Sequence, residues 1–504
     1  MFPPTADPGL VPGPLKLSRS AGAFTLDDTT AIRVSPGAAP AAALLRALLA
    51  PATGLPLPLA PDGRMVLVLD PGLTGLGAEG YGLTVSGEAV LLRAACAAGL
   101  RHGVQTIRQL LPVAALAAEP VRGVRWSLPG VEITDVPRYA WRGAMLDVAR
   151  HFQPVSFLRR FTDLLALHKL NVLHLHLTDD QGWRMPVTAF PRLTEVGGVP
   201  HGGAYSREEL RGLVAYAADR GVTVVPEIEM PGHARAALAA YPHLGNFPER
   251  RLGVWRSWGV CDTVFGVADE VLDFCRTVLD EVMDLFPSPR VHVGGDECPH
   301  TEWHRSPAAL RRVADEGLAG PDALHGWFME RVGSFLTDRG RRPLGWTETG
   351  HDLPESFTAL AWRDERHGLA AARRGQPVIM APHRSTYLDY PQSSLPGEPP
   401  GQAGPAVGLS AVYATEPAPA HWETAAAAQV LGTQAQLWTE YVATAAHAEY
   451  LAFPRLCALA DTAWSGGRDW PGFQARLHHH RSRLDALGVP SRPPAILRPE
   501  RTTR

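Results

Sequence analysis

The stretch Val291-His292-Val293-Gly294-Gly295-Asp296-Glu297 joins a short apolar strand to two consecutive carboxylates. Neighbouring residues on a strand point to opposite sides, so the two acids share one side only if the backbone bends. Gly294 and Gly295 permit that bend. Two adjacent acids beside an apolar strand repel each other and lose water, which favours a general acid that stays protonated near neutral pH. A solvated loop is the competing interpretation, and the rest of the chain decides between them.

Short apolar strands that end in polar or aromatic residues recur from about residue 137 onward. Eight such strands are predicted, at residues 143–147, 172–177, 222–229, 291–293, 343–346, 358–362, 377–381 and 430–437. Helical stretches separate most of them, at residues 154–168, 206–220, 269–286, 323–339 and 366–374. This alternation predicts an α/β fold, a (β/α)8 TIM barrel, whose active face lies at the carboxyl ends of its strands. The acids and indoles gather at those ends, which favours the catalytic interpretation.

The rest of the chain is predicted to form a companion domain and two tails. Residues 1–14 are rich in proline and are expected to form a loose N-terminal tail. Residues 15–130 mix short strands with helices, which predicts a small α/β domain that precedes the barrel. This domain carries no recognisable site chemistry and is interpreted as structural. The barrel is predicted over residues 131–490, and residues 491–504 are expected to form a C-terminal tail.

The composition excludes several classes of function. The 504 residues carry a net charge of −3, which gives no attractive field for nucleic acid or acidic membranes. No apolar stretch reaches the ~18 residues of a membrane span, and the five cysteines show no disulfide framework. The N-terminus lacks a secretory signal, so we expect a cytoplasmic protein, or a secreted one if the start is misannotated or trimmed. The oligomeric state stays open.

The motifs of other enzyme classes are missing or incomplete. No GxSxG nucleophile elbow and no phosphate-binding P-loop occurs. His174 and His176 form an HxH pair that suggests a metal-dependent barrel, but the later strands supply Trp, Tyr, Asp and Glu instead of further ligands. A hydrogen-bonded core role is the commoner outcome, and no metal or other cofactor is predicted. The run His478-His479-His480 is interpreted as a solvated helix face.

Indoles and carboxylates at the strand ends describe a sugar pocket. Three indoles and three charged groups are candidates for contact with the ring and its hydroxyls: Trp346, Trp362, Trp438, Arg150, Asp389 and Glu440. Glycoside hydrolysis usually takes two carboxyls on opposite sides of the scissile bond, ~5 Å apart in retaining enzymes. An acid pair adjacent in sequence fits that arrangement poorly. One carboxyl can instead protonate the leaving oxygen while the other serves a group on the sugar itself.

At this point the sequence resembles a known family. The stretch from His292 to Glu297 is similar to the signature of family 20 glycoside hydrolases, the β-N-acetylhexosaminidases, and so are residues 146–152, 173–183 and 226–233. The similarity runs from about residue 131 to residue 465, and the preceding α/β layer resembles the family's small N-terminal domain. The resemblance implies a substrate-assisted exception to the scheme with two opposed carboxylates.

The resemblance also implies a role for each matching residue. Glu297 is expected to protonate the glycosidic oxygen and then to activate water. Asp296 is expected to hold the N–H of the 2-acetamido group, while Tyr387 donates to its carbonyl, whose oxygen is the nucleophile. The other implied roles are walls of the pocket for Trp346, Trp362 and Trp438, contacts with hydroxyls for Arg150, Asp389 and Glu440, and support of Glu297 by Asp179 and His233.

The implied activity is exo-acting, retaining hydrolysis of terminal N-acetyl-D-hexosamine (GlcNAc or GalNAc) from chitooligosaccharides or glycans through an oxazolinium intermediate. A non-catalytic sugar-binding barrel and the same barrel with another exo-specificity, disaccharide-releasing or sulfated-sugar-preferring, are the alternatives. Glu229 departs from the family pattern, which has Asp there, and no Trp occurs between residues 404 and 417. The loop 391–408 is either a lid or a plain connection.

Overall fold

The computed structural model describes residues 8–466 and 468–492, in which eight parallel strands close into a barrel. Around the barrel the strands follow the order β11-β12-β13-β14-β15-β16-β7-β8. Their bounds are β7 (Trp141–Asp147), β8 (Val172–His176), β11 (Thr223–Met230), β12 (Arg290–Gly294), β13 (Arg342–Thr347), β14 (Thr358–Ala361), β15 (Val378–Met380) and β16 (Val430–Leu437). The prediction of a (β/α)8 barrel with a preceding small domain is confirmed.

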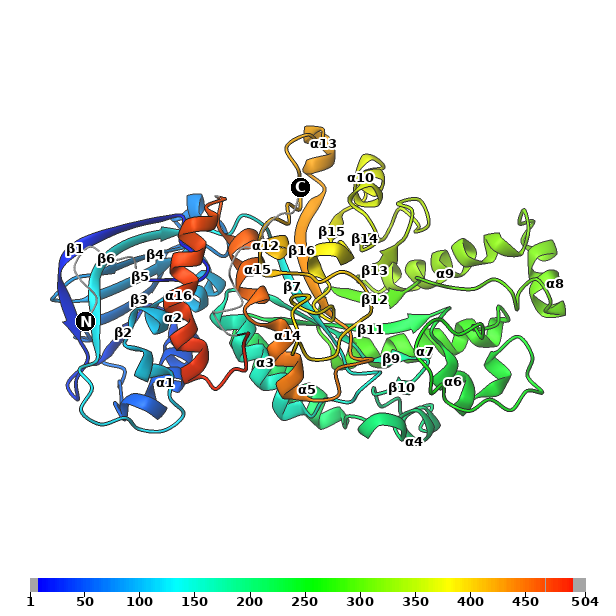
Figure 1. Cartoon of the computed structure of the whole chain (residues 1–504), viewed down its shortest axis with the longest axis horizontal. Helices are drawn as coiled ribbons and strands as arrows, with labels where there is room; N and C mark the ends of the chain where they lie inside the picture. The colour runs from blue at the N-terminus through cyan, green and yellow to red at the C-terminus, as the bar shows by residue number, and fades with distance from the viewer. Residues whose placement is uncertain (1–7, 467, 493–504) are drawn as a thin grey trace.

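Helices cover the outside of the barrel (Figure 1). The longer ones are α3 (Val155–Leu167), α5 (Arg207–Asp219), α7 (Asp269–Leu285), α9 (Leu324–Asp338), α10 (Glu365–Arg373), α14 (Ala445–Ala452) and α15 (Arg455–Trp464). In α7 the buried residues recur every three or four positions, as in Val271, Cys275, Val278 and Val282, so one face packs on the strands. Every residue of β7 is buried, as expected for a parallel strand covered on both faces.

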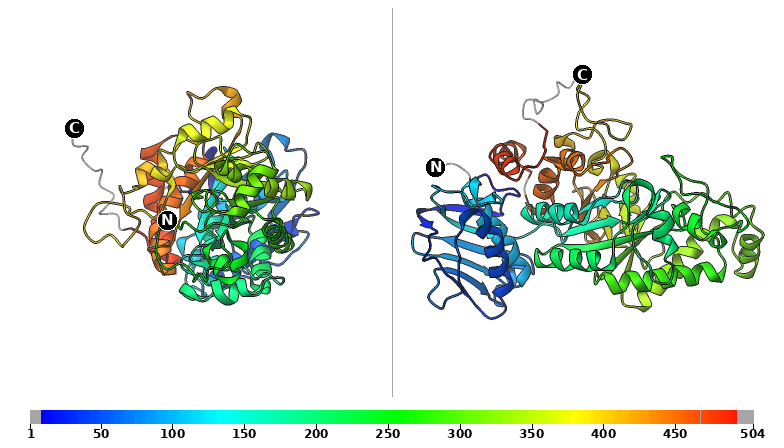
Figure 2. Two further views of the ribbon diagram at one scale, coloured as in Figure 1. Left: turned by 90° about the vertical axis from the view of Figure 1, so that its right-hand side faces the viewer. Right: turned by 90° about the horizontal axis from the view of Figure 1, so that it is seen from below.

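The small domain is a six-stranded sheet with two helices (Figure 2). The strands follow the order β1 (Lys16–Thr25), β6 (Ser127–Asp135), β4 (Tyr81–Val85), β5 (Val90–Ala94), β3 (Met65–Leu69) and β2 (Ile32–Val34), and the helices are α1 (Ala39–Thr53) and α2 (Ala97–Leu110). Strand β6 crosses the boundary predicted at residue 130. It belongs to this sheet because it pairs with both β1 and β4.

The described part of the N-terminal tail is not loose. Val11 is fully buried, and its N–H donates to the side-chain oxygen of Gln109 at 3.0 Å. The guanidinium of Arg483, on α16 (Trp470–Ala486), donates to the carbonyls of Pro8 and Gly9. Helix α16 lies beside the small domain in Figure 1, and Arg483 also donates to the carbonyl of Gln109 in that domain at 2.7 Å. The prediction of a loose tail is wrong for residues 8–14, because a proline-rich sequence does not reveal contacts with distant parts of the chain. Residues 1–7 lie outside the described residues.

The C-terminal tail begins inside the structure, where Arg492 is buried and forms an ion pair with Glu398 at 2.9 Å. Residues 493–504 of the predicted tail lie outside the described residues. Within residues 8–466 and 468–492, no helix is long and apolar enough to cross a membrane.

Candidate active site

The two consecutive acids leave β12 through a bend made by left-handed backbone. Gly294 has φ +68° and Gly295 has φ +94°, conformations that side chains with a Cβ rarely adopt. Glu297 itself has φ +45°, although it is not a glycine. Such strain in a non-glycine residue persists only where the surrounding structure holds it, and it is concentrated at functional sites. The bend brings both carboxyls to one cavity at the carboxyl end of the barrel strands.

That cavity has a volume of about 220 Å³. Its lining residues come from the ends of several strands and from one loop: Arg150, Asp179, Glu229, His233, Asp296, Glu297, Trp362, Tyr387, Asp389, Tyr390, Gln402, Trp438 and Glu440. Ten of the eleven residues predicted for the site therefore line one cavity. Six of the lining residues carry carboxyls, against one arginine and one histidine. The cavity is thus suited to a ligand that is neutral or positively charged.

The two acids experience different surroundings. Burial, with the nearby charges of Glu297 and Glu227, raises the pKa of Asp296 to about 7, although the His233 cation opposes the shift. The side chain of Asp296 is 11% exposed, whereas that of Glu297 is 30% exposed. Arg363 Nη2 lies 3.6 Å from the Glu297 carboxylate, while both carboxyls lie close to the His233 ring, at 3.9 Å and 3.8 Å from Nε2. Two carboxyls in unlike environments are the arrangement that separates acid and base roles.

His233 and Asp179 connect the acids to Arg150. Burial alone would lower the pKa of His233, but the Asp179 carboxylate at 3.3 Å and its acidic neighbours raise it well above its usual value. Burial would raise the pKa of Asp179, but Arg150 at 2.7 Å, His233 and His176 hold it well below its usual range. An ionised Asp179 thus holds a charged imidazole near Asp296 and Glu297. The support of Glu297 by these two residues stays a prediction.

Two of the three predicted indoles line the cavity. The ring of Tyr387 stacks on Trp362, with centroids 6.0 Å apart and planes inclined by 20°, and lies 6.2 Å from Trp438. The Arg150 guanidinium lies 5.0 Å from the Trp438 ring. Trp346 does not line the cavity: it is 1% exposed, and its indole N–H donates to Glu227 at 2.7 Å in the barrel interior. Sequence could not reveal this, because the partner of the indole is the Glu227 side chain of β11, which lies two strands away across the barrel interior.

The two predicted hydroxyl-binding acids lie close enough to repel each other. Burial and the charge of Glu440 raise the pKa of Asp389 well above its usual value. The pKa of Glu440 is also raised by burial, although Arg150 opposes the shift. One oxygen of Asp389, Oδ1, has no hydrogen-bond partner although it is buried. Such an oxygen is ready to accept a hydrogen bond from a sugar hydroxyl.

Three residues that line the cavity were not predicted from the sequence: Tyr390, Gln402 and Glu229. Gln402 comes from the loop 391–408, and its N–H donates to the carbonyl of Asp389 at 2.9 Å. The path of a loop depends on contacts with distant residues, so the sequence could not place Gln402. For Tyr390 the only local indication of a place in the site was its position directly after Asp389. This loop supplies part of the cavity wall and is not a plain connection.

The HxH pair lies in the barrel interior. His174 and His176 both approach the Glu227 carboxylate, which also lies 2.7 Å from His292 Nδ1. The side chains of His174, Glu227 and His292 could together hold a metal ion. Glu227 already has several hydrogen-bonding partners there, and all these groups are fully buried. The geometry agrees with the predicted hydrogen-bonded core role.

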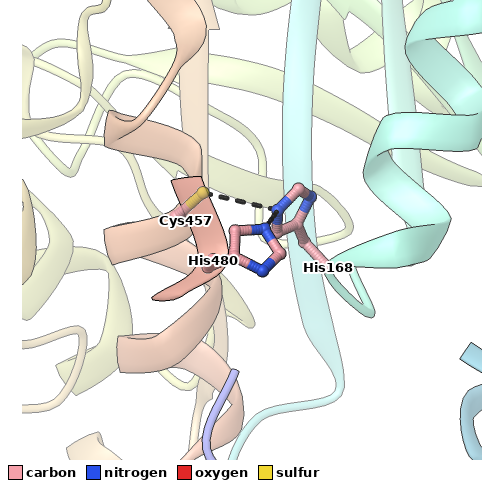
Figure 3. A group of neighbouring side chains, drawn as sticks. All are labelled: His168, Cys457 and His480. Atoms are coloured by element: carbon pink, nitrogen blue, oxygen red, sulfur yellow. Dashed lines mark hydrogen bonds between the residues drawn. The ribbon is translucent and has the colours of Figure 1, made fainter. Parts of the chain in front are cut away.

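A second group of possible metal ligands lies away from the cavity. Figure 3 shows His168, Cys457 and His480 turned toward one another from separate helical segments. The Nε2 atoms of the two histidines lie 2.8 Å apart, and Cys457 Sγ lies 3.3 Å from His168 Nε2. Two imidazoles on one zinc ion require about 3.3 Å between nitrogens. The shorter distance is that of a hydrogen bond, which joins α16 to the barrel. His480 is buried, so the prediction of a solvated helix face is wrong for this residue.

The fold and the cavity define a glycoside hydrolase built on an eight-stranded barrel, with its acids at the strand ends. The model for the glycosyl hydrolase family 20 catalytic domain matches residues 139–467, and the model for domain 2 of that family matches residues 7–136. The chain therefore belongs to glycosyl hydrolase family 20, whose members are glycosidases that act on β-N-acetylhexosaminides.

Relatives and solved structures agree with this assignment. The chain is 39% identical to a beta-hexosaminidase of Porphyromonas gingivalis over 96% of its own length, but it spans only 65% of that relative. It is 34% identical to a beta-N-acetylhexosaminidase of Cellulomonas fimi, covering 82% of this chain and 80% of the relative. The structure of the Streptomyces coelicolor GH20 beta-N-acetylhexosaminidase matches with a TM-score of 0.85 at 34% identity, covering 96% of this chain and 98% of the other. The structure of a Vibrio harveyi GH20 exo beta-N-acetylglucosaminidase in complex with N-acetylglucosamine matches with a TM-score of 0.88 at 32% identity. The match covers 96% of this chain and 78% of the other.

Proposed function

We propose that this chain removes terminal non-reducing N-acetylhexosamine residues from β-N-acetylhexosaminides, such as chitooligosaccharides or glycans, with retention of configuration. The observation that carries the proposal is the shared cavity of Asp296 and Glu297, in which one carboxyl is buried and the other is partly exposed. The partly exposed Glu297 can meet a glycosidic oxygen and, later, a water molecule. The buried Asp296 is suited to a group that belongs to the bound sugar.

The 2-acetamido arm of the sugar is the proposed nucleophile. Asp296 accepts its N–H, Tyr387 donates to its carbonyl, and the carbonyl oxygen attacks the anomeric carbon while Glu297 protonates the leaving oxygen. An intramolecular nucleophile arrives at a very high effective concentration, so the protein needs only to orient it and stabilise the charge. Asp296 must be ionised to stabilise the oxazolinium cation. Water activated by Glu297 then opens the intermediate, and two inversions give retention.

The buried end of the cavity suits a terminal sugar. Arg150 and Asp389 are 6% and 3% exposed, and together with Glu440 they offer charge-assisted hydrogen bonds to hydroxyls. The stacked rings of Trp362 and Tyr387, with Trp438, provide apolar surface for the ring and the acetamido methyl group. The bound N-acetylglucosamine of the Vibrio harveyi structure supports the same ligand here.

The charge of the cavity favours neutral sugars over the sulfated sugars of one alternative. Six carboxyls line it, and the two cations, Arg150 and His233, are already held by Asp179. A sulfate group would lose its water among these carboxyls and would find no cation that is not already paired, which is unfavourable. We therefore expect 6-sulfated N-acetylglucosaminides to be poorer substrates than their neutral counterparts.

One comparison tests the proposal: the initial rates on a chromogenic β-N-acetylglucosaminide and on the matching β-glucoside. We expect kcat/KM to be at least about 10³-fold higher for the N-acetylated substrate, because only that substrate carries its own nucleophile. Equal rates on the two would overturn the substrate-assisted mechanism. Tight binding of N-acetylglucosamine without turnover would instead support the non-catalytic sugar-binding barrel.

A further inference from the structure

Arg363 is a charged side chain outside the cavity that lies beside Glu297. It follows Trp362 just after the end of β14, and its side chain is 44% exposed. Its Nη2 atom lies 3.6 Å from the Glu297 carboxylate, yet Arg363 is not one of the residues that line the cavity. In the proposed reaction the cavity holds the terminal sugar, and Glu297 protonates the oxygen that joins this sugar to the next. Arg363 therefore lies on the side where the leaving group emerges.

Two neighbours hold the Arg363 guanidinium in place. Its Nε and Nη2 atoms both donate to the carboxylate of Glu348, just after β13, and the distance from Nε is 2.7 Å. The backbone N–H of Glu348 donates in turn to Asp352 at 2.7 Å, which fixes the backbone there. The guanidinium also lies 4.2 Å from the centre of the Trp362 ring. A side chain that is already held loses less rotamer freedom when it binds a ligand, so Arg363 is a preorganised donor.

The remaining nitrogen of the guanidinium is available for a ligand. Within residues 8–466 and 468–492, Nε and Nη2 of Arg363 are used, but Nη1 makes no hydrogen bond to another residue. An arginine side chain only donates, so its ligand must bring an acceptor oxygen. The hydroxyls and the acetamido carbonyl of a second sugar offer such oxygens. An anionic leaving group is disfavoured, because Glu348 already compensates the charge of Arg363 and Glu297 lies beside it.

We propose that Arg363 binds the sugar that leaves, by donating from Nη1 to one of its oxygens, and so favours oligosaccharides with a neutral second sugar. The inference rests on the proposed function, because it takes Glu297 as the acid that releases this sugar. It extends recognition from the terminal residue to the next residue along the glycan.

Three substrates with the same terminal sugar separate contact with the leaving sugar from an effect on Glu297. N,N′-diacetylchitobiose releases a second sugar, methyl β-N-acetylglucosaminide releases methanol, and a nitrophenyl β-N-acetylglucosaminide releases an activated phenol. The first two both need the proton of Glu297, because alkoxides are poor leaving groups, but only the first carries a second sugar. The assay measures kcat and KM for each substrate from the N-acetylglucosamine that is released.

Two substitutions change the donor in different ways. Arg363→Met keeps much of the side-chain length without charge or donors, and Arg363→Lys keeps the charge beside Glu297 without the planar fork. Arg366→Met is the matched control, since Arg366 is a nearby arginine on α10 whose side chain is 77% exposed. This control should match wild type on all three substrates.

We expect Arg363→Met to lower kcat/KM for diacetylchitobiose by roughly tenfold to hundredfold, the worth of a hydrogen bond that involves a charged group. Most of the loss should appear in KM, because the contact is already present in the bound substrate. The methyl and nitrophenyl glycosides should stay within about threefold of wild type, since an ion pair as exposed as that of Arg363 contributes little. Arg363→Lys should be impaired on diacetylchitobiose alone, and less than Arg363→Met.

The inference is overturned if Arg363→Met cleaves diacetylchitobiose as well as wild type does, since the leaving sugar would then not touch this side chain. It is overturned equally if the methyl glycoside loses as much as diacetylchitobiose, because Arg363 would then act on Glu297. Full activity of Arg363→Lys on diacetylchitobiose would also overturn it, because a point charge would then suffice. Equal wild-type rates on an N-acetylglucosaminide and the matching glucoside would refute the proposed function, whereas a selective wild type with an indifferent Arg363→Met would refute only this inference.

Discussion

Replacement of Asp296 by Asn should stabilise the protein while it removes activity, and the stabilisation should depend on pH. Burial raises the pKa of this carboxyl from 3.8 to about 7, so the folded chain binds the proton more tightly than the unfolded chain does. The sign follows: the unfolding free energy from this group is highest at acid pH and falls as the pH rises toward 7. The ionised group costs about 4 kcal/mol at pH 7 and about 2 kcal/mol at pH 5. Asn mimics the protonated form and has no such cost at either pH.

The assay is thermal unfolding of wild type and Asp296→Asn in parallel at pH 5 and pH 7, by circular dichroism or a dye. The difference in stability between the two proteins should grow by about 2 kcal/mol from pH 5 to pH 7. The same variant should lose about 10²–10³-fold in kcat, because a neutral amide cannot stabilise the oxazolinium cation. A difference in melting temperature that is equal at both pH values would refute the reasoning, since Asp296 would then not be held at a raised pKa.

Further predictions concern the acid, the tyrosine, the bend and metal dependence. Glu297→Gln should abolish most hydrolysis of substrates with poor leaving groups and spare activated aryl glycosides; a kcat within a few-fold of wild type on both kinds would remove its role as the acid. Tyr387→Phe should lower kcat by about 10²-fold with little change in KM, because a donor to the attacking carbonyl is lost; rate assays at saturating substrate measure this. Gly294→Ala should lower the melting temperature, because the left-handed backbone alone costs about 1–3 kcal/mol and the new Cβ would collide with Glu229; an unchanged melting temperature would contradict the geometry. Dialysis against a chelator should leave kcat/KM unchanged, and a loss restored by a divalent cation would point to the buried histidines of the barrel centre.

Local patterns in the sequence predicted most of the fold. Apolar runs of three to eight residues, separated mostly by helical stretches, predicted the eight barrel strands, since both faces of a parallel strand are buried. The positions of Asp296, Glu297, Trp362 and Trp438 at the carboxyl ends of those strands predicted one shared site. These predictions were possible because strand direction and side-chain alternation are properties of short segments.

The tertiary structure decided what depends on distant segments. Trp346 stands at a strand end like the other indoles, yet Glu227 of another strand holds it in the barrel interior. Gln402 reaches the cavity because its loop folds back onto Asp389, and His480 is buried because α16 packs on the barrel. Burial and partner choice are sums over contacts between residues far apart in the chain. The sequence alone therefore determined the barrel and the chemical groups at its mouth, while only the folded chain decided which groups face the sugar and which carboxyls keep a proton.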